Sequence, residues 1–158
     1  MTLPYIHRIR QLADHVLAVP ERFSPEDVFS ACAVEFSAVP CTNPHAREFV
    51  AYPASGPFSA ILFHGPRPPA NGAPAVVIMH VARGIRITRA DMSGTFELPI
   101  QSARIDPRTP PEGTVSFTSQ QGTRTLRIRF DARSQLLRDI SVHVNRQQPP
   151  RTGGDSPE

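Results

Sequence analysis

Lysine and tryptophan are both absent from this 158-residue chain. All 17 basic residues are therefore arginine, against 14 acidic residues, and the formal net charge is +3. Three explanations of the missing lysine stay open. Codon bias in a GC-rich genome also enriches Arg, Pro and Ala, and a chain without lysine cannot carry tags attached to lysine amines. Arginine is also preferred where a planar guanidinium binds a phosphate or carboxylate through two hydrogen bonds.

Cysteine is scarce as well. Cys32 and Cys41 are the only two, and no further ligands follow them at the spacing of a structural zinc site. His45 extends the pair to a Cys, Cys, His set, but this spacing matches no zinc pattern. The sequence therefore predicts two free thiols, no metal and no cofactor.

Long apolar runs are missing too. His7, Arg8, Arg10, Asp14 and His15 interrupt the apolar residues near the N-terminus, which is unlike a signal peptide. No stretch approaches the roughly 18 apolar residues of a membrane span. We expect a cytoplasmic protein. Phosphate-binding glycine loops, dinucleotide fingerprints, metalloprotease helices and nucleophile elbows are also absent, which argues against the common nucleotide and metal enzymes.

What is present predicts one α+β domain over residues 1–146, followed by a disordered Pro- and Gly-rich tail over 147–158. Apolar residues recur at helical spacing through residue 17 after Pro4 in the first turn. Ser24-Pro25-Glu26-Asp27 has the composition of a helix start, and a second helix is expected from Pro25 to about Phe36.

The rest of the chain has the alternation of β-strands, punctuated by Pro and Gly. We expect strands at 48–52, 58–63, 75–82, 85–89, 95–98, 114–120, 123–131 and 136–145. The fold class is therefore two N-terminal helices packed on an antiparallel β-meander, as an open sandwich or a curved half-barrel.

The last three strands have a predictable register. A two-residue loop at Gln121-Gly122 places Phe117 opposite Leu126, so that apolar residues meet on one face and polar residues on the other. A three-residue loop at 132–134 then places Arg127 opposite Asp139. One face of this meander is expected to pack on the core and the other to meet water.

Two groups of residue types suggest catalysis. Asp139, Ser141 and His143 point to one side of the last strand and are the residue types of a nucleophilic triad. Their roots lie roughly 7 Å apart in succession, which is too long for the relay of a triad. His64, His80 and His143 lie in different strands, and their convergence would form the three-histidine set of some zinc enzymes. Buried histidines paired with backbone are the alternative.

Arginines suggest an anion site. Arg127 and Arg129 share the polar face of one strand, and Arg86 joins them in a positive stripe if its segment lies beside that strand. The same face offers Thr118 and Ser116 but no aromatic residue, which argues against stacking of nucleic-acid bases. A solvated face with local Arg–Asp pairing is the simpler interpretation.

The leading hypothesis is a non-enzymatic binding or protein-interaction module, with a protein partner or self-association through a sheet edge or face. The first alternative is a small cavity enzyme of the cyclase or isomerase type that acts on an apolar molecule. The second is anion or nucleic-acid binding by the arginine-rich face. A large cavity between helices and sheet favours the enzyme, whereas a filled core favours the interaction module.

Overall fold

The computed structural model describes residues 3–19, 23–67 and 74–144. Three α-helices and one short 3-10 helix (η1) are present among them: α1 Leu3–Leu17, α2 Pro25–Cys32, α3 Arg89–Ser93 and η1 Ile100–Ser102. The strands are β1 Ser37–Val39, β2 Ala46–Ala51, β3 Phe58–Pro66, β4 Ala75–Val81, β5 Arg104–Asp106, β6 Thr114–Gln121, β7 Arg124–Asp131 and β8 Leu137–Val144. The predicted tail lies outside the described residues.

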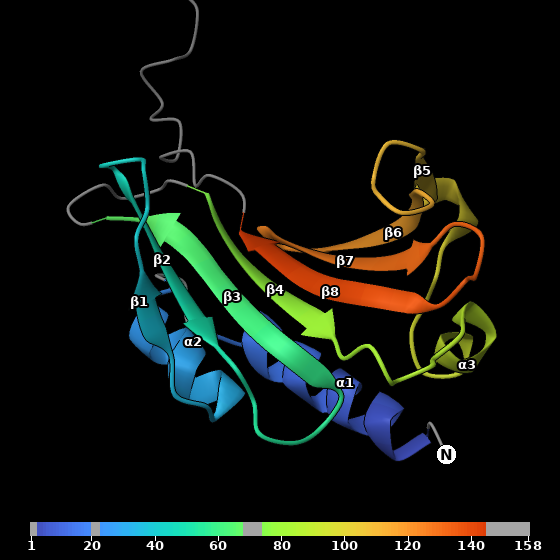
Figure 1. Cartoon of the computed structure of the whole chain (residues 1–158), viewed down its shortest axis with the longest axis horizontal. Coiled ribbons are helices and arrows are strands. Elements are labelled where there is room, and N and C mark those ends of the chain that lie inside the picture. Colours follow the sequence, from blue (N-terminus) through green and yellow to red (C-terminus); the bar gives the residue numbers. More distant parts are fainter. Residues whose placement is uncertain (1–2, 20–22, 68–73, 145–158) are drawn as a thin grey trace, which may run out of the picture.

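The eight strands form one antiparallel sheet in the order β1-β2-β3-β4-β8-β7-β6-β5. It consists of two four-strand meanders, β1 to β4 and β5 to β8, which are joined by the pairing of β4 with β8. Both helices of the N-terminal region lie against the same face of the sheet (Figure 1). The predicted class, N-terminal helices on an antiparallel meander, is confirmed, and the sheet stays open because β1 and β5 remain at opposite edges.

The first helix follows from its apolar stripe. Ile6, Ile9, Ala13 and Val16 recur at helical spacing and are all buried against the core. None of the helices in the described part of the chain combines the length and the apolar character needed to cross a membrane.

The second helix starts as predicted but ends earlier. The Ser24 hydroxyl accepts a hydrogen bond from the Asp27 backbone N–H, which caps the N-terminus. The helix stops at Cys32 because Ala33 adopts a left-handed conformation with φ of 55°, and its N–H closes the last turn. The predicted extension to Phe36 is therefore wrong, although Phe36 still stacks on Phe29 with ring centroids 4.4 Å apart.

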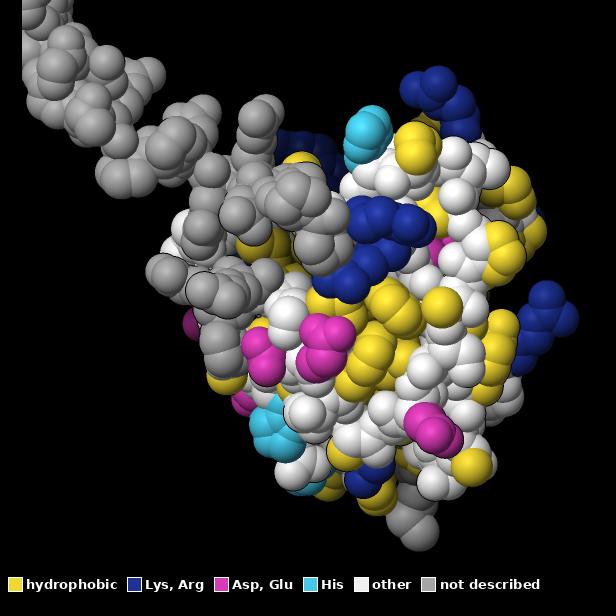
Figure 2. Space-filling view, turned by 90° about the vertical axis from the view of Figure 1, so that its left-hand side faces the viewer, with side chains coloured by type: hydrophobic (Ala, Val, Ile, Leu, Met, Phe, Trp, Pro, Cys, Tyr) yellow, Lys and Arg dark blue, Asp and Glu magenta, His cyan; other side chains and the backbone are white. Residues whose placement is uncertain are grey.

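An aromatic cluster follows from this packing. Phe29 of α2 also meets Phe49 of β2 at 5.1 Å, edge to face. Figure 2 views the molecule from the side of β1 and α2, where hydrophobic side chains gather in the middle of the surface. Phe36 and Phe49 are partly buried and pack against the main core.

The space between helices and sheet is filled. Ile9 and Val16 of α1 meet a layer of sheet residues that are 0–1% exposed, namely Ile61, Phe63, Val77, Met79, Ile140 and Val142. Such close packing is typical of a domain interior, in which each buried side chain contributes roughly 1.5–3 kcal/mol.

Two predicted strands, 85–89 and 95–98, are wrong. Residues 89–93 form α3 instead, and Thr88 makes only an isolated bridge to Leu136. Thr88 and Asp91 form a reciprocal capping box that starts the helix, a signal stronger than the local alternation of apolar residues. The short edge strands β1 and β5 were not predicted.

The predicted register of the last strands is also wrong, by two residues. The turn between β6 and β7 is Gly122-Thr123, because Gly122 supplies a φ of 63° at its first central position. Phe117 consequently faces Ile128 rather than Leu126. In the next hairpin Arg129, not Arg127, faces Asp139. A shift of two keeps the side chains of these pairs on their predicted faces, whereas a bulge between Arg129 and Phe130 pairs Phe130 with Leu137.

The pairing of Arg129 with Asp139 can be tested by measuring the stability of two variants. Arg129→Ala removes the hydrogen-bonded partner of Asp139, a side chain that is 1% exposed, and leaves the buried carboxylate with only the His80 ring, 4.0 Å away. We expect the free energy of unfolding to fall by about 3 kcal/mol. Arg127→Ala, on the same face of the same strand but exposed, is the matched control and should change stability by less than about 0.5 kcal/mol. Urea unfolding followed by circular dichroism measures both, and the reverse order of effects would restore the predicted Arg127–Asp139 pairing.

Candidate functional site

The face of the sheet that points away from α1 and α2 carries most of the chemistry, and we call it the open face. Strand pairing arranges it in three cross-strand rows. The first row is Ala60, His80, Asp139, Arg129, Ser116 and Arg104. The second is Ser37, Val50, Leu62, Ile78, Ser141, Arg127 and Thr118. The third is Val39, Glu48, His64, Val76, His143, Thr125 and Gln120.

Asp139 and Arg129 form a buried ion pair in the first row. The Arg129 Nε donates to Asp139 Oδ1 at 2.8 Å, and the second guanidinium nitrogen donates to Oδ2. This hydrogen bonding raises the pKa of Arg129 above its usual value. His80 adds a weaker contact, since its Nδ1 lies 4.0 Å from Asp139 Oδ2. The carboxylate is therefore held by two groups and is satisfied within the fold.

Ser141 and His143 form the second pair on β8. The Ser141 Oγ and the His143 Nε2 are 2.8 Å apart, so the side chains meet despite the spacing of their backbones. The expectation that alternation keeps them apart is thus wrong for this pair. The Asp139 carboxylate accepts hydrogen bonds from Arg129 instead, and among the described residues it accepts none from His143. The three residue types of a triad are present without its relay.

Burial and charge both act on His143. Burial lowers its pKa from the usual 6.5, and the positive charge of Arg127 lowers it further. A neutral imidazole can accept the Ser141 hydroxyl proton in a hydrogen bond, which accounts for the short contact.

Arg127 is an exposed cation of the open face. It lies between Thr118 of β6 and Ser141 of β8 in the second row. Within the described ranges it forms no ion pair and no hydrogen bond through its side chain, in contrast to Arg129. Its guanidinium is therefore available to an anion from outside.

The remaining sequence candidates are placed apart. His64 and His143 lie in the third row with Val76 between them, and His80 lies four residues further along β4 than Val76. At roughly 4.8 Å per strand and 3.4 Å per residue, the three rings do not share one ion. Arg86 belongs to the segment that leads into α3, and β8 and β6, not that segment, flank β7.

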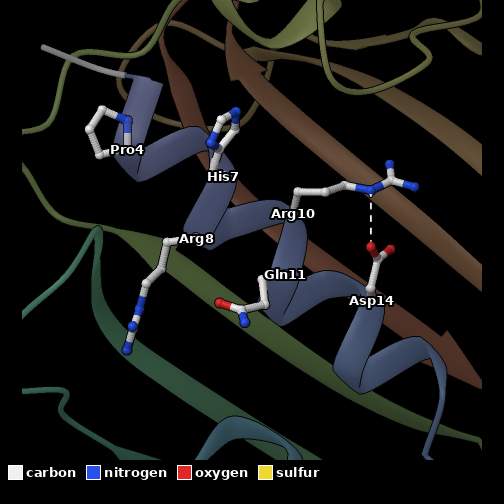
Figure 3. Close-up of a pocket in the computed structure, with 6 residues that line it drawn as sticks. All are labelled: Pro4, His7, Arg8, Arg10, Gln11 and Asp14. Atoms are coloured by element: carbon white, nitrogen blue, oxygen red, sulfur yellow. Dashed lines mark hydrogen bonds and ion pairs between the residues drawn. The ribbon is translucent and has the colours of Figure 1, made fainter.

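His7, Gln11 and His15 lie on the exposed outer face of α1. A surface hollow of about 570 Å³ is lined by α1 residues alone, and their side chains diverge (Figure 3). Arg8 extends away from His7, and Arg10 is bound to Asp14 at 3.2 Å. This face resembles an ordinary solvated helix face.

The cysteines have different surroundings. Cys32 is buried beside a cavity of about 220 Å³ between α1, α2 and the start of β3, and burial raises the pKa of its thiol to about 12. Cys41 lies in the β1–β2 connection and is half-buried. Its sulfur, a Glu48 oxygen and a His64 ring nitrogen lie within 4.8 Å of one another, a group that sequence reasoning missed.

Comparisons with family models, with curated proteins and with solved structures found no match for this chain. The function is therefore inferred from the geometry of the chain itself.

We expect His143 to titrate below pH 6.5. The folded state then binds fewer protons than the unfolded state between the two pKa values, so stability falls as the pH falls through that window. Titration of the imidazole carbon shift by NMR measures the pKa. Arg127→Ala should raise it, because one repulsive charge is removed, but burial should keep it below 6.5. A pKa at or above 6.5 in the wild type would contradict this environment.

The two thiols should differ in reactivity. Because the thiolate is the reactive form, buried Cys32 should remain unmodified in the folded protein. Iodoacetamide at pH 8 should alkylate Cys41 alone, and both cysteines after unfolding in urea. Peptide mass spectrometry identifies the site. Modification of Cys32 in the native chain at the rate of Cys41 would show that α2 opens readily.

Proposed function

We propose that this chain is a protein-interaction module that binds a partner on the open face of its sheet. The observation that supports this proposal is Arg127 of β7, whose exposed guanidinium in the second row of that face has no ion-pair or hydrogen-bond partner in the described part of the chain. The partner that fits it presents a carboxylate beside an apolar side chain.

The apolar part of the proposed binding surface lies in the second row, which also contains Arg127. Val50, Leu62 and Ile78 follow one another across β2, β3 and β4, and each is half-buried in the isolated chain. Ile78 is two strands from Arg127, or about 10 Å. A partner that covers this strip removes apolar surface from water and pairs the free cation, which is the usual composition of an interface with an apolar core and a polar rim.

A binding role is also favoured over a cavity enzyme. The layer between the helices and the sheet is filled, with Val77, Met79 and Ile140 at 0% exposure. Small-molecule enzymes commonly enclose their ligand in a pocket of several hundred cubic ångströms. The cavity between the helices and β3, beside Cys32, is smaller, at about 220 Å³. A cavity of about 430 Å³ exists at the ends of β3, β4 and β8, outside the layer between the helices and the sheet.

Nucleic acid is a weaker fit to the same surface. Arg129 is paired with Asp139, and Arg104 at the edge of the first row donates to the Ala103 carbonyl, which leaves Arg127 as the arginine without a partner in these two rows. The three rows contain no Phe, Tyr or Trp on which bases would stack. A single guanidinium next to aliphatic side chains suits a protein carboxylate better.

Site-specific crosslinking tests this proposal. A photoreactive benzophenone residue replaces Thr118, next to Arg127, in cells that naturally make the chain, and the control position is Asp14 on the outer face of α1. We expect a protein crosslinked from position 118 and not from position 14. Arg127→Glu should abolish the crosslink, whereas Arg86→Glu, the same charge change in an exposed residue elsewhere, should leave it intact.

The purified partner then gives a quantitative check. Arg127→Glu should weaken its binding at least tenfold, about 1.4 kcal/mol, because one attractive charge becomes repulsive. Crosslinks that do not depend on Arg127, or equal crosslinks from both positions, would overturn the proposal. Crosslinking only to a second copy of this chain would replace it with self-association.

A further inference from the structure

Three ligand types meet at one end of the open face, in residues that the proposed interaction does not use. Glu48 of β2 and His64 of β3 are direct cross-strand neighbours, and the Glu48 Oε1 lies 2.9 Å from the His64 Nδ1. Cys41 approaches from the β1–β2 connection. One donor atom from each of the three lies within 4.8 Å of the other two.

This donor set has a definite preference. Thiolate, imidazole and carboxylate are the three ligand classes that Zn²⁺ takes in proteins, at about 2.3 Å for sulfur and about 2.0–2.2 Å for nitrogen and oxygen. Calcium and magnesium take oxygen ligands, so a thiol and an imidazole argue against them. We propose that Cys41, Glu48 and His64 together bind Zn²⁺, with the fourth position of the ion taken by water.

The present geometry needs little change to accept the ion. Donor atoms around a tetrahedral zinc lie roughly 3.3–3.8 Å apart at those bond lengths, against 2.9 Å for the Glu48–His64 contact and at most 4.8 Å within the group. The Glu48 and His64 side chains are 38% and 44% exposed, so small rotations of them can bring the donor atoms to these distances. His64 then presents its Nδ1 lone pair to the ion, with its proton on Nε2.

Access from solvent is open. His64 lines a cavity of about 430 Å³ at the ends of β3, β4 and β8, together with His45 of the β1–β2 connection and His143. An ion reaches His64 through this cavity, and water completes its coordination there. Backbone pairing holds two of the ligands, since β2 and β3 keep Glu48 and His64 adjacent without the metal. This inference does not depend on the proposed partner binding.

Cobalt supplies the spectroscopic test, because Co²⁺ occupies zinc sites and reports its ligands. The full chain, freed of any affinity tag, is titrated with Co²⁺ at pH 7.5. We expect one equivalent bound, with visible bands of four-coordinate geometry and a near-ultraviolet thiolate-to-cobalt charge-transfer band. Zn²⁺ should displace the cobalt and erase the bands.

Matched variants assign the ligands. Cys41→Ser should abolish the charge-transfer band, and His64→Gln and Glu48→Gln should each weaken binding at least tenfold. Two control variants change residues outside the proposed site. Cys32→Ala removes the other thiol, and His80→Gln alters an open-face histidine that is not one of the three proposed ligands. Both variants should bind Co²⁺ with the affinity of the wild type. Circular dichroism verifies that each variant is folded.

The wild type alone gives an independent readout. Stoichiometric Zn²⁺ should slow alkylation of Cys41 at least tenfold, while Mg²⁺ at the same concentration should not. Cobalt binding without a thiolate band, affinity unchanged by Cys41→Ser and His64→Gln, or alkylation of Cys41 indifferent to Zn²⁺ would each overturn the site. The Arg127→Glu variant separates the two proposals. It should lose the crosslink to the partner while it binds zinc as the wild type does.

Discussion

The pairing of β4 with β8 joins the two halves of the sheet, and the rest of the structure depends on it. These strands are far apart in the sequence, yet they contribute Val77, Met79, Ile140 and Val142, all 0% exposed, to one layer of the core. The helices pack on that layer, so the N-terminal region and both meanders share a single core. The same pairing brings His80 beside Asp139 on the opposite face. Core and site are therefore produced by one set of strand contacts.

Covering a wide sheet on one side leaves polar groups in the middle of the other side that must satisfy one another. Asp139 and Ser141 are only 1% and 4% exposed although α1 and α2 lie against the opposite face of the sheet. Each is paired across or along a strand, Asp139 with Arg129 and Ser141 with His143. Buried polar groups without partners are costly, so these pairs belong to the stability of the sheet. Arg127 lies on the same face but forms no such pair among the described residues. Arg129 therefore stabilises the fold, whereas the Arg127 side chain is available for binding.

Periodicity in the sequence was sufficient for the class of the fold and for the face of most residues in the last strands, because alternation has a period of two. It failed at the bulge between Arg129 and Phe130, which places Leu137 on the core side. It was not sufficient for register, which the turn decides. A glycine at the first central position of the β6–β7 turn shifts the pairing of β6 with β7 by two residues. In the next hairpin a longer connection, in which Gln135 has a φ of 61°, places Arg129 rather than Arg127 opposite Asp139. The start of α3 had a readable signal, Thr88 three residues before Asp91, which local alternation obscured.

The metal-binding group shows why some sites escape sequence reasoning altogether. Six residues separate Cys41 from Glu48 and fifteen separate Glu48 from His64, so the three have no short motif spacing. They meet because the β2–β3 pairing places Glu48 opposite His64 and the β1–β2 connection returns to the same end of the sheet. Predicting the group requires the order and the register of two hairpins, and the first strand of one of them, β1, has only three residues. Ligands that converge across strands become visible once the sheet is known, whereas helix ligands at fixed spacing are visible before.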